Sequence, residues 1–75
     1  MSDNNSAKKV NFSGRVQGVG FRFTTLNIAH RYDVTGYVRN CADGTVNMLA
    51  EGPEEHINSL IADIEKAFKG NIQDK

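Results

Sequence analysis

The chain has 75 residues, enough for one small domain that buries only about 60% of the surface of its unfolded chain. Nine Lys and Arg residues balance nine Asp and Glu residues, so the overall basic charge typical of nucleic-acid-binding proteins is missing. One cysteine excludes an internal disulfide, and neither a signal-peptide pattern nor an apolar run of roughly 20 residues is present. We expect a cytoplasmic protein with no nucleic-acid or membrane partner, a disordered polar tail at residues 1–6 and one domain at residues 7–75.

The first half of the chain predicts a strand followed by a helix. Apolar and polar residues alternate from Lys8 to Gln17, as is typical of a strand with one buried face. Gly18 and Gly20 interrupt this pattern. Segment 21–34 then lacks glycine and proline, which favours a helix although several of its residues are weak helix formers.

The second half predicts a hairpin and a second helix. Asp43 and Gly44 supply the tight turn of a hairpin between strands 37–41 and 45–51. Pro53 suits the first turn of the following helix, because its missing N–H has no intrahelical partner. That helix carries the clearest apolar stripe of the chain at helical spacing. The stripe consists of Ile57, Leu60, Ile61, Ile64 and Phe68.

The order strand, helix, strand, strand, helix predicts an α+β fold of the ferredoxin-like, split β-α-β type. Two helices would cover one face of an antiparallel sheet, and a right-handed connection would place the first strand beside the strand that ends the hairpin. Gly70 is a natural helix stop, and only Ile72 could begin another strand, so we expect the final strand to be missing or rudimentary. The first strand would then be an exposed edge, which predicts a homodimer or a mobile, marginally stable monomer.

The segment GRVQGVGFR, residues 14–22, is the first candidate site. Its glycine spacing fits neither the dinucleotide-binding G-x-G-x-x-G pattern nor a Walker loop, which also needs a Lys followed by Ser or Thr. Two interpretations remain from the residues alone. The loop could be only a strand-to-helix turn with Arg22 in solvent, or its backbone N–H groups could converge on an anion that the planar Arg22 fork also binds.

These motifs resemble the acylphosphatase family. GRVQGVGFR, then GYVRN at 36–40 and DGTVNMLAEG at 43–52, follow that family's order and spacing, and the resemblance covers roughly residues 10–68. It implies a hydrolase that splits an acyl phosphate into carboxylate and inorganic phosphate without metal or cofactor. The resemblance implies that Asn40 positions the attacking water. The residues that would bind the phosphoryl group, or another small anion, are Val16, Gln17, Gly18, Val19, Gly20, Phe21 and Arg22.

The implied chemistry suits these residue types. A carboxylate leaves without being protonated, because its conjugate acid titrates near pH ~4, so neither motif needs the general acid that a phosphate monoester requires. Backbone N–H groups and Arg22 would hold the phosphoryl oxygens, while a carboxamide aligns a water, as a glutamine does in some GTPases. Asn40 taken alone reads more simply as a turn residue before the hairpin loop. Asp33 stands where the family usually has a glycine that ends the first helix, and we expect it to take over that left-handed cap.

Two alternative functions stay open. One is a catalytically weak or inactive phosphate-binding or interaction module of the same fold, and the other is a sheet-based RNA binder. The second would use aromatic residues that we expect in the core. These are Phe12, Phe21, Phe23, Tyr32, Tyr37 and Phe68.

Other reactive or charged residues have simpler interpretations. Cys41 lacks the downstream arginine of a cysteine phosphatase, so we expect a small strand residue. His30 and His56 have no neighbour at metal-ligand spacing. Arg15 and Arg39 either widen the positive field around the loop or are ordinary surface charges.

Overall fold

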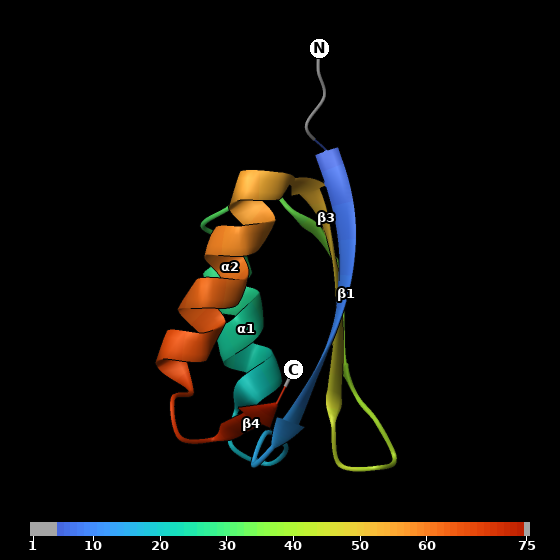
Figure 1. Cartoon of the computed structure of the whole chain (residues 1–75), viewed down its shortest axis with the longest axis vertical. Coiled ribbons are helices and arrows are strands. Elements are labelled where there is room, and N and C mark those ends of the chain that lie inside the picture. Colours follow the sequence, from blue (N-terminus) through green and yellow to red (C-terminus); the bar gives the residue numbers. More distant parts are fainter. Residues whose placement is uncertain (1–4, 75) are drawn as a thin grey trace.

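Two helices cover one face of a four-stranded antiparallel sheet (Figure 1) in the computed structural model, which describes residues 5–74. The elements are β1 (Asn5–Gly14), α1 (Phe21–Ala29), β2 (Thr35–Asn40), β3 (Val46–Pro53), α2 (Glu54–Ala67) and β4 (Ile72–Asp74). The strand order is β2-β3-β1-β4. The predicted ferredoxin-like α+β fold is therefore confirmed, including the position of β1 beside β3 and the rudimentary final strand.

Two boundaries differ from those expected. Of the predicted tail, residues 1–4 lie outside the described residues, whereas Asn5 and Ser6 already belong to β1, where they pair with Pro53 and Gly52. α1 ends well before residue 34. Its helical ladder is replaced by shorter i→i−3 bonds, such as the one from the Tyr32 N–H to the Ala29 carbonyl oxygen at 3.0 Å.

Asp33 does not take over the left-handed cap that the sequence led us to expect. Within residues 5–74, no residue other than glycine has a positive φ. The Asp33 N–H instead donates a hydrogen bond to Nδ1 of His56 in the first turns of α2, at 2.9 Å. The chain leaves α1 through its i→i−3 bonds and is held by α2, so no left-handed residue is required there.

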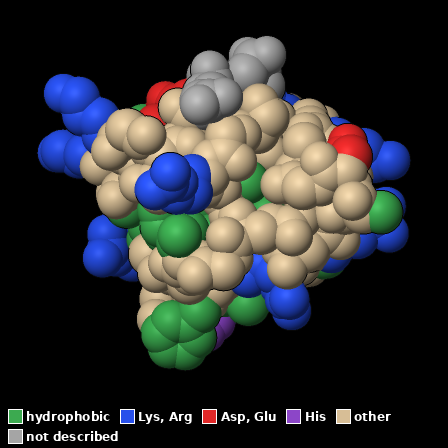
Figure 2. Space-filling view, turned by 90° about the horizontal axis from the view of Figure 1, so that it is seen from below, with side chains coloured by type: hydrophobic (Ala, Val, Ile, Leu, Met, Phe, Trp, Pro, Cys, Tyr) green, Lys and Arg blue, Asp and Glu red, His purple; other side chains and the backbone are tan. Residues whose placement is uncertain are grey.

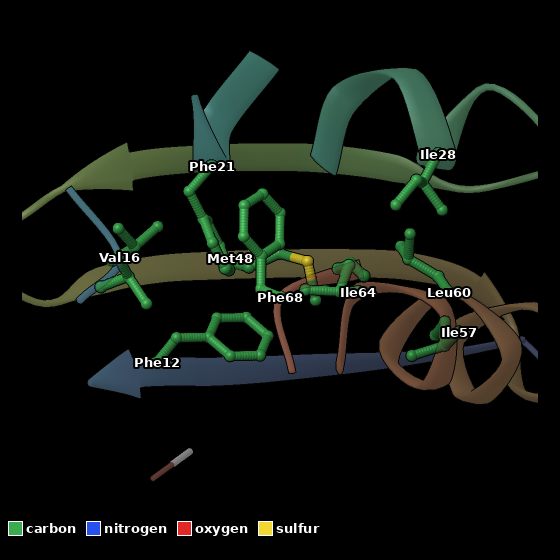
Figure 3. Close-up of a cluster of buried hydrophobic side chains, with 11 residues drawn as sticks. Phe12, Val16, Phe21, Ile28, Met48, Ile57, Leu60, Ile64 and Phe68 are labelled. Atoms are coloured by element: carbon green, nitrogen blue, oxygen red, sulfur yellow. The ribbon is translucent and has the colours of Figure 1, made fainter. Parts of the chain in front are cut away.

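The hydrophobic core lies between the helices and the sheet face that they cover (Figure 3). β3 contributes alternate residues to it, and α2 contributes Ile57, Leu60 and Ile64 of the predicted stripe. Of the other two stripe residues, Ile61 is only partly buried and Phe68 is the C-cap of α2. The buried hydrophobic residues are Phe12, Val16, Phe21, Ile28, Val46, Met48, Ala50, Ile57, Leu60, Ile64 and Phe68. Three rings lie in sequence, with centroids 5.2 Å apart for Phe12 and Phe21 and 4.6 Å apart for Phe21 and Phe68. This aromatic group fixes the start of α1 to the end of the sheet.

β1 is a central strand for only part of its length. One of its edges pairs with β3 from Asn5 to Phe12. On the other edge, β4 pairs only with Ser13 and Gly14, across a register shift. In the described part of the chain, no strand covers the rest of that edge, so the first strand is exposed there as expected. Neither helix within residues 5–74 has the length and apolar character needed to cross a bilayer.

Candidate active site

The loop between β1 and α1 is anchored in the core at both ends. Val16 and Phe21 are each only 1% exposed, while Gly18, Val19 and Gly20 between them face solvent. Any contact that Val16 or Phe21 makes with a ligand must therefore come from the backbone. The two buried residues hold the short exposed segment in place at both of its ends.

Gly18 and Gly20 determine the shape of this segment. Each has a φ of 77°, and a Cβ added at either one would meet no atom of residues 5–74 within 4 Å. The glycines are thus required for their left-handed backbone and not for lack of space. Left-handed residues that alternate with ordinary ones turn neighbouring N–H groups toward one side, which makes a concave anion-binding surface.

The N-terminus of α1 adds positive potential to the loop. Gly20 is the N-cap, no side chain in the described part of the chain caps the helix, and its first turn contains no acidic residue. The first helical hydrogen bond runs from the Thr24 N–H to the Gly20 carbonyl at 3.0 Å. The earlier N–H groups have no intrahelical acceptor, and the helix dipole favours an anion in front of them. Arg22 lies in this turn and is exposed, so it adds a full positive charge.

Arg22 and Asn40 line the same depression, which has a volume of about 380 Å³. Asn40 is the last residue of β2 and pairs with Val46 of β3, which brings its carboxamide to the end of the sheet where the loop lies. The complete lining is Val16, Gly18, Gly20, Phe21, Arg22, Phe23, Leu26 and Asn40. The two residues singled out from separate motifs are therefore brought together with both loop glycines.

The two arginines considered for a wider positive field lie elsewhere. Arg15 lines a neighbouring depression with Gln17 and Gly44. The Arg39 guanidinium stacks over the Tyr37 ring, 5.4 Å from its centroid. Because successive strand residues point to opposite faces, Arg39 lies on the sheet face without helices, away from the residues that line the depression.

The side chain of Gln17 connects the loop to the hairpin instead of lining the depression. Its Nε2 donates to the carbonyl oxygens of Cys41 and Thr45, at 2.8 Å each. Within the predicted loop, Gln17 could therefore meet an anion only with its backbone. Sequence reasoning missed this role, because the two acceptors lie 24 and 28 residues away along the chain.

The turn of the hairpin is itself held by hydrogen bonds. Asp43 Oδ1 accepts one from the Thr45 hydroxyl at 2.6 Å and one from the Thr45 N–H at 3.1 Å. These bonds, the hydroxyl first, lower the pKa of the Asp43 carboxyl. Since the Thr45 carbonyl accepts from Gln17, the turn and the loop form one hydrogen-bonded unit.

Asn71 holds the start of the loop from the other side. The Arg15 N–H donates to the Asn71 carbonyl oxygen at 2.7 Å, and Nδ2 of Asn71 donates to the Arg15 carbonyl oxygen at 3.1 Å. The N–H and the carbonyl oxygen of Arg15 are thus both hydrogen-bonded to Asn71, the residue that precedes β4. The loop is fixed on one side by the hairpin and on the other by the segment that follows α2.

Part of the depression that Arg22 and Asn40 line is apolar. Phe23 and Leu26 line the same depression as Arg22 and are 72% and 46% exposed. Hydrophobic side chains lie beside Lys and Arg side chains at this end of the molecule (Figure 2). The expectation that Phe23 belongs to the core is wrong, because α1 buries Phe21, Thr25 and Ile28 and so turns Phe23 outward. Tyr37 is likewise partly exposed, at 38%.

A comparison with known families decides the classification of this chain. The sequence profile of the family described as Acylphosphatase matches residues 8–74. The chain belongs to the acylphosphatase family. The resemblance seen in the loop and hairpin motifs therefore extends through α2 to β4.

Named acylphosphatases from bacteria are similar to this chain in sequence. The acylphosphatase of Rhizobium etli is 49% identical over 70 residues, which cover 93% of this chain and 74% of that protein. The acylphosphatase of Salinibacter ruber is 59% identical over 49 residues, which cover 65% of this chain and 52% of that protein. This member of the family thus spans three quarters of one relative and about half of another.

Solved acylphosphatases share the fold. The crystal structure of the Bacillus subtilis acylphosphatase matches with a TM-score of 0.77 and 38% identity, covering 80% of this chain and 67% of that one. The Coxiella burnetii acylphosphatase gives a TM-score of 0.77 and 33% identity, covering 84% of this chain and 66% of that one. The arrangement of loop and hairpin described above is therefore set in an acylphosphatase framework.

The remaining reactive residues lie outside the loop between β1 and α1. Cys41 is half-buried, and its N–H bonds to the Thr45 carbonyl at 2.8 Å within the hairpin. His30 is the C-cap of α1, and His56 accepts the bond from Asp33. Across residues 5–74, no three His, Cys, Asp or Glu side chains are grouped as metal ligands would be.

Proposed function

We propose that this acylphosphatase-family chain hydrolyses acyl phosphates to a carboxylate and inorganic phosphate. The observation that carries the proposal is that Arg22, Asn40 and the two left-handed glycines line one depression at the N-terminus of α1. In the proposed complex, the loop N–H groups and the Arg22 guanidinium bind the phosphoryl oxygens. The Asn40 carboxamide orients a water opposite the acyl oxygen.

In the reaction that we propose, the water oxygen bonds to phosphorus while the bond from phosphorus to the acyl oxygen breaks. The carboxylate leaves with the electron pair and needs no proton. Among the described residues, no Asp, Glu or His lines the depression, so one proton of the water passes to a phosphoryl oxygen and the other stays on the new hydroxyl group of the phosphate. Arg22 and the N–H groups stabilise the charge that spreads over the equatorial oxygens. They supply this charge stabilisation without a metal or cofactor.

A phosphate-release assay tests this proposal. The full chain is incubated with benzoyl phosphate in the presence of a chelator, and we expect release of phosphate. Arg22→Ala and Asn40→Ala should each lower kcat/KM by at least about 100-fold, the usual effect of removing a donor to the transition state. The exposed residues Arg31 and Asn27 lie outside the depression, so Arg31→Ala and Asn27→Ala serve as matched controls and should leave kcat/KM unchanged.

Two outcomes would contradict the proposal. Turnover that is insensitive to Arg22→Ala and Asn40→Ala would place the chemistry elsewhere. No turnover, together with phosphate-induced shifts of the Gly18 and Gly20 amide resonances, would identify a phosphate-binding module of the same fold.

We also propose that the protein works in the cytoplasm. The single cysteine leaves the chain without an internal disulfide, which suits a reducing compartment. Fractionation of cells that express the chain tests this, with the protein expected in the cytoplasmic fraction and its Cys41 thiol available to alkylating reagents. Recovery in a secreted fraction would contradict it.

A further inference from the structure

A second depression lies between α1 and β2 and has a volume of about 210 Å³. Its lining is mostly apolar and includes Leu26 and Ala29 of α1, Val38 of β2 and Leu60 of α2. Leu26 also lines the depression that holds Arg22 and Asn40. The two hollows are therefore neighbours that meet at one side chain.

The periodicity of the two elements makes a path between these hollows. Residues 22, 26 and 29 follow one another along one side of α1, because positions three and four apart are neighbours on a helix. Asn40 and Val38 share the helix-covered face of β2, because alternate strand residues point the same way. Both rows lead from the polar groups of the candidate active site to apolar residues.

We propose that the acyl group of the substrate lies along this path, so that the enzyme prefers acyl phosphates with extended apolar acyl groups over acetyl phosphate. This inference rests on the proposed function. With its phosphoryl group at Arg22, the substrate directs its acyl carbons past the half-exposed Leu26 toward the pocket lined by Ala29 and Val38. An acetyl group is too short to leave the first hollow.

The size and character of the pocket suit such an occupant. Its volume of about 210 Å³ exceeds the roughly 150 Å³ of an apolar protein cavity that admits benzene. Each methylene that leaves water for this lining favours binding. Phe23 extends the apolar surface at the entrance, where it is 72% exposed. A bound acyl chain would remove part of that surface from water.

Two substrates and one substitution test the inference in the full chain. The ratio of kcat/KM for octanoyl phosphate to that for acetyl phosphate should be at least about tenfold, as expected of apolar groups that fill a pocket. Leu26→Asn keeps the approximate shape of the side chain and removes its apolar character, so it should lower this ratio about tenfold. Asn27 is exposed on the same helix and lines neither hollow, so Asn27→Ala should leave the ratio unchanged.

A binding measurement tests, without turnover, whether an acyl chain occupies this path. Octanoate added to the methyl-labelled chain should shift the resonances of Leu26, Val38 and Leu60, whereas acetate should not. Equal kcat/KM values for the two substrates, a ratio unaffected by Leu26→Asn, or the absence of these shifts would each overturn the inference and leave the proposed hydrolysis intact. Failure to hydrolyse either substrate would instead refute the proposed function, and the inference with it.

Discussion

Nε2 of Gln17 lies 2.8 Å from the carbonyl oxygen of Cys41, the residue that follows Asn40. The same nitrogen lies 2.8 Å from the Thr45 carbonyl oxygen on the other side of the turn. One side chain thus ties the loop that leads to Arg22 to the hairpin that carries Asn40. The distance between the two halves of the candidate active site depends on this connection.

Replacement of Gln17 by leucine should therefore affect both stability and activity. It removes two hydrogen bonds, although the Cys41 and Thr45 carbonyl oxygens still accept the N–H groups of Gly44 and Cys41. At about 0.5–1.5 kcal/mol for each bond, we expect the free energy of unfolding to fall by about 1–3 kcal/mol. Urea denaturation measures this loss, and benzoyl phosphate kinetics should show a lower kcat, because the Arg22 and Asn40 side chains are no longer held in register. A variant with unchanged stability and kcat would show that the connection is dispensable.

Substitution of Gly20 should lower the stability of the protein by the cost of placing the new residue in a left-handed backbone conformation. No atom of the residues that the structure describes obstructs a Cβ at this position, so the penalty is conformational, about 1–2 kcal/mol for an ordinary residue. We expect Gly20→Asn to be more stable than Gly20→Ala, and Gly20→Ala more stable than Gly20→Val, because asparagine enters this region most easily and β-branched residues least easily. Thermal unfolding of the three variants gives the order. Equal midpoints would indicate that the loop rearranges freely.

Thr25→Val should stabilise the protein. Thr25 is fully buried, and its Oγ1 has no hydrogen-bond partner among the described residues. A methyl group of similar shape removes an unsatisfied polar atom, which we expect to raise the free energy of unfolding by about 1 kcal/mol. Thr24 is half-buried beside it on the same helix, and Thr24→Val is the matched control, expected to change stability by less than about 0.5 kcal/mol. A loss of stability in Thr25→Val would reveal a partner for the hydroxyl.

The hairpin turn should weaken in acid. The bonds from Thr45 lower the pKa of Asp43 in the folded protein, so ionised Asp43 stabilises the fold above its unfolded pKa of about 3.9. This contribution is lost as the pH falls through the lower pKa of the folded state. The Thr45 amide resonance should therefore titrate below about pH 4 and should not do so in Asp43→Asn. Identical acid titrations in the two proteins would contradict the assignment.

The outer edge of β1 should be open to exchange or to a second chain. Within residues 5–74, β4 covers only Ser13 and Gly14 on that side, and an uncovered edge favours pairing between chains. We expect either a dimer in sedimentation velocity or weak hydrogen-exchange protection along the edge. A compact monomer with strong protection throughout residues 10–16 would rule out both.

Local patterns in the sequence were enough to predict the order of the elements. The alternation in residues 8–12, the stripe from Ile57 to Phe68 and the turn at Asp43 and Gly44 each reflect a preference carried by a few neighbouring residues. The same holds for Gly18 and Gly20, whose left-handed backbone depends on the absence of a side chain and not on distant contacts. The end of α1 at Ala29 was not predicted, because it is formed by backbone hydrogen bonds that many sequences could make.

The sequence by itself therefore determined the element order and the glycine loop, whereas the choice of Arg22 and Asn40 as a pair rested on the resemblance of their motifs to the acylphosphatase family. Only the tertiary structure decided that Gln17 serves the hairpin, that Asn71 binds Arg15 from 56 residues away, and that Leu26 joins two hollows. Periodicity reports which face of an element is buried, but it cannot report which residue of another element meets that face. Those meetings depend on the packing of the helices against the sheet, and the contacts that support the candidate active site arise from that packing.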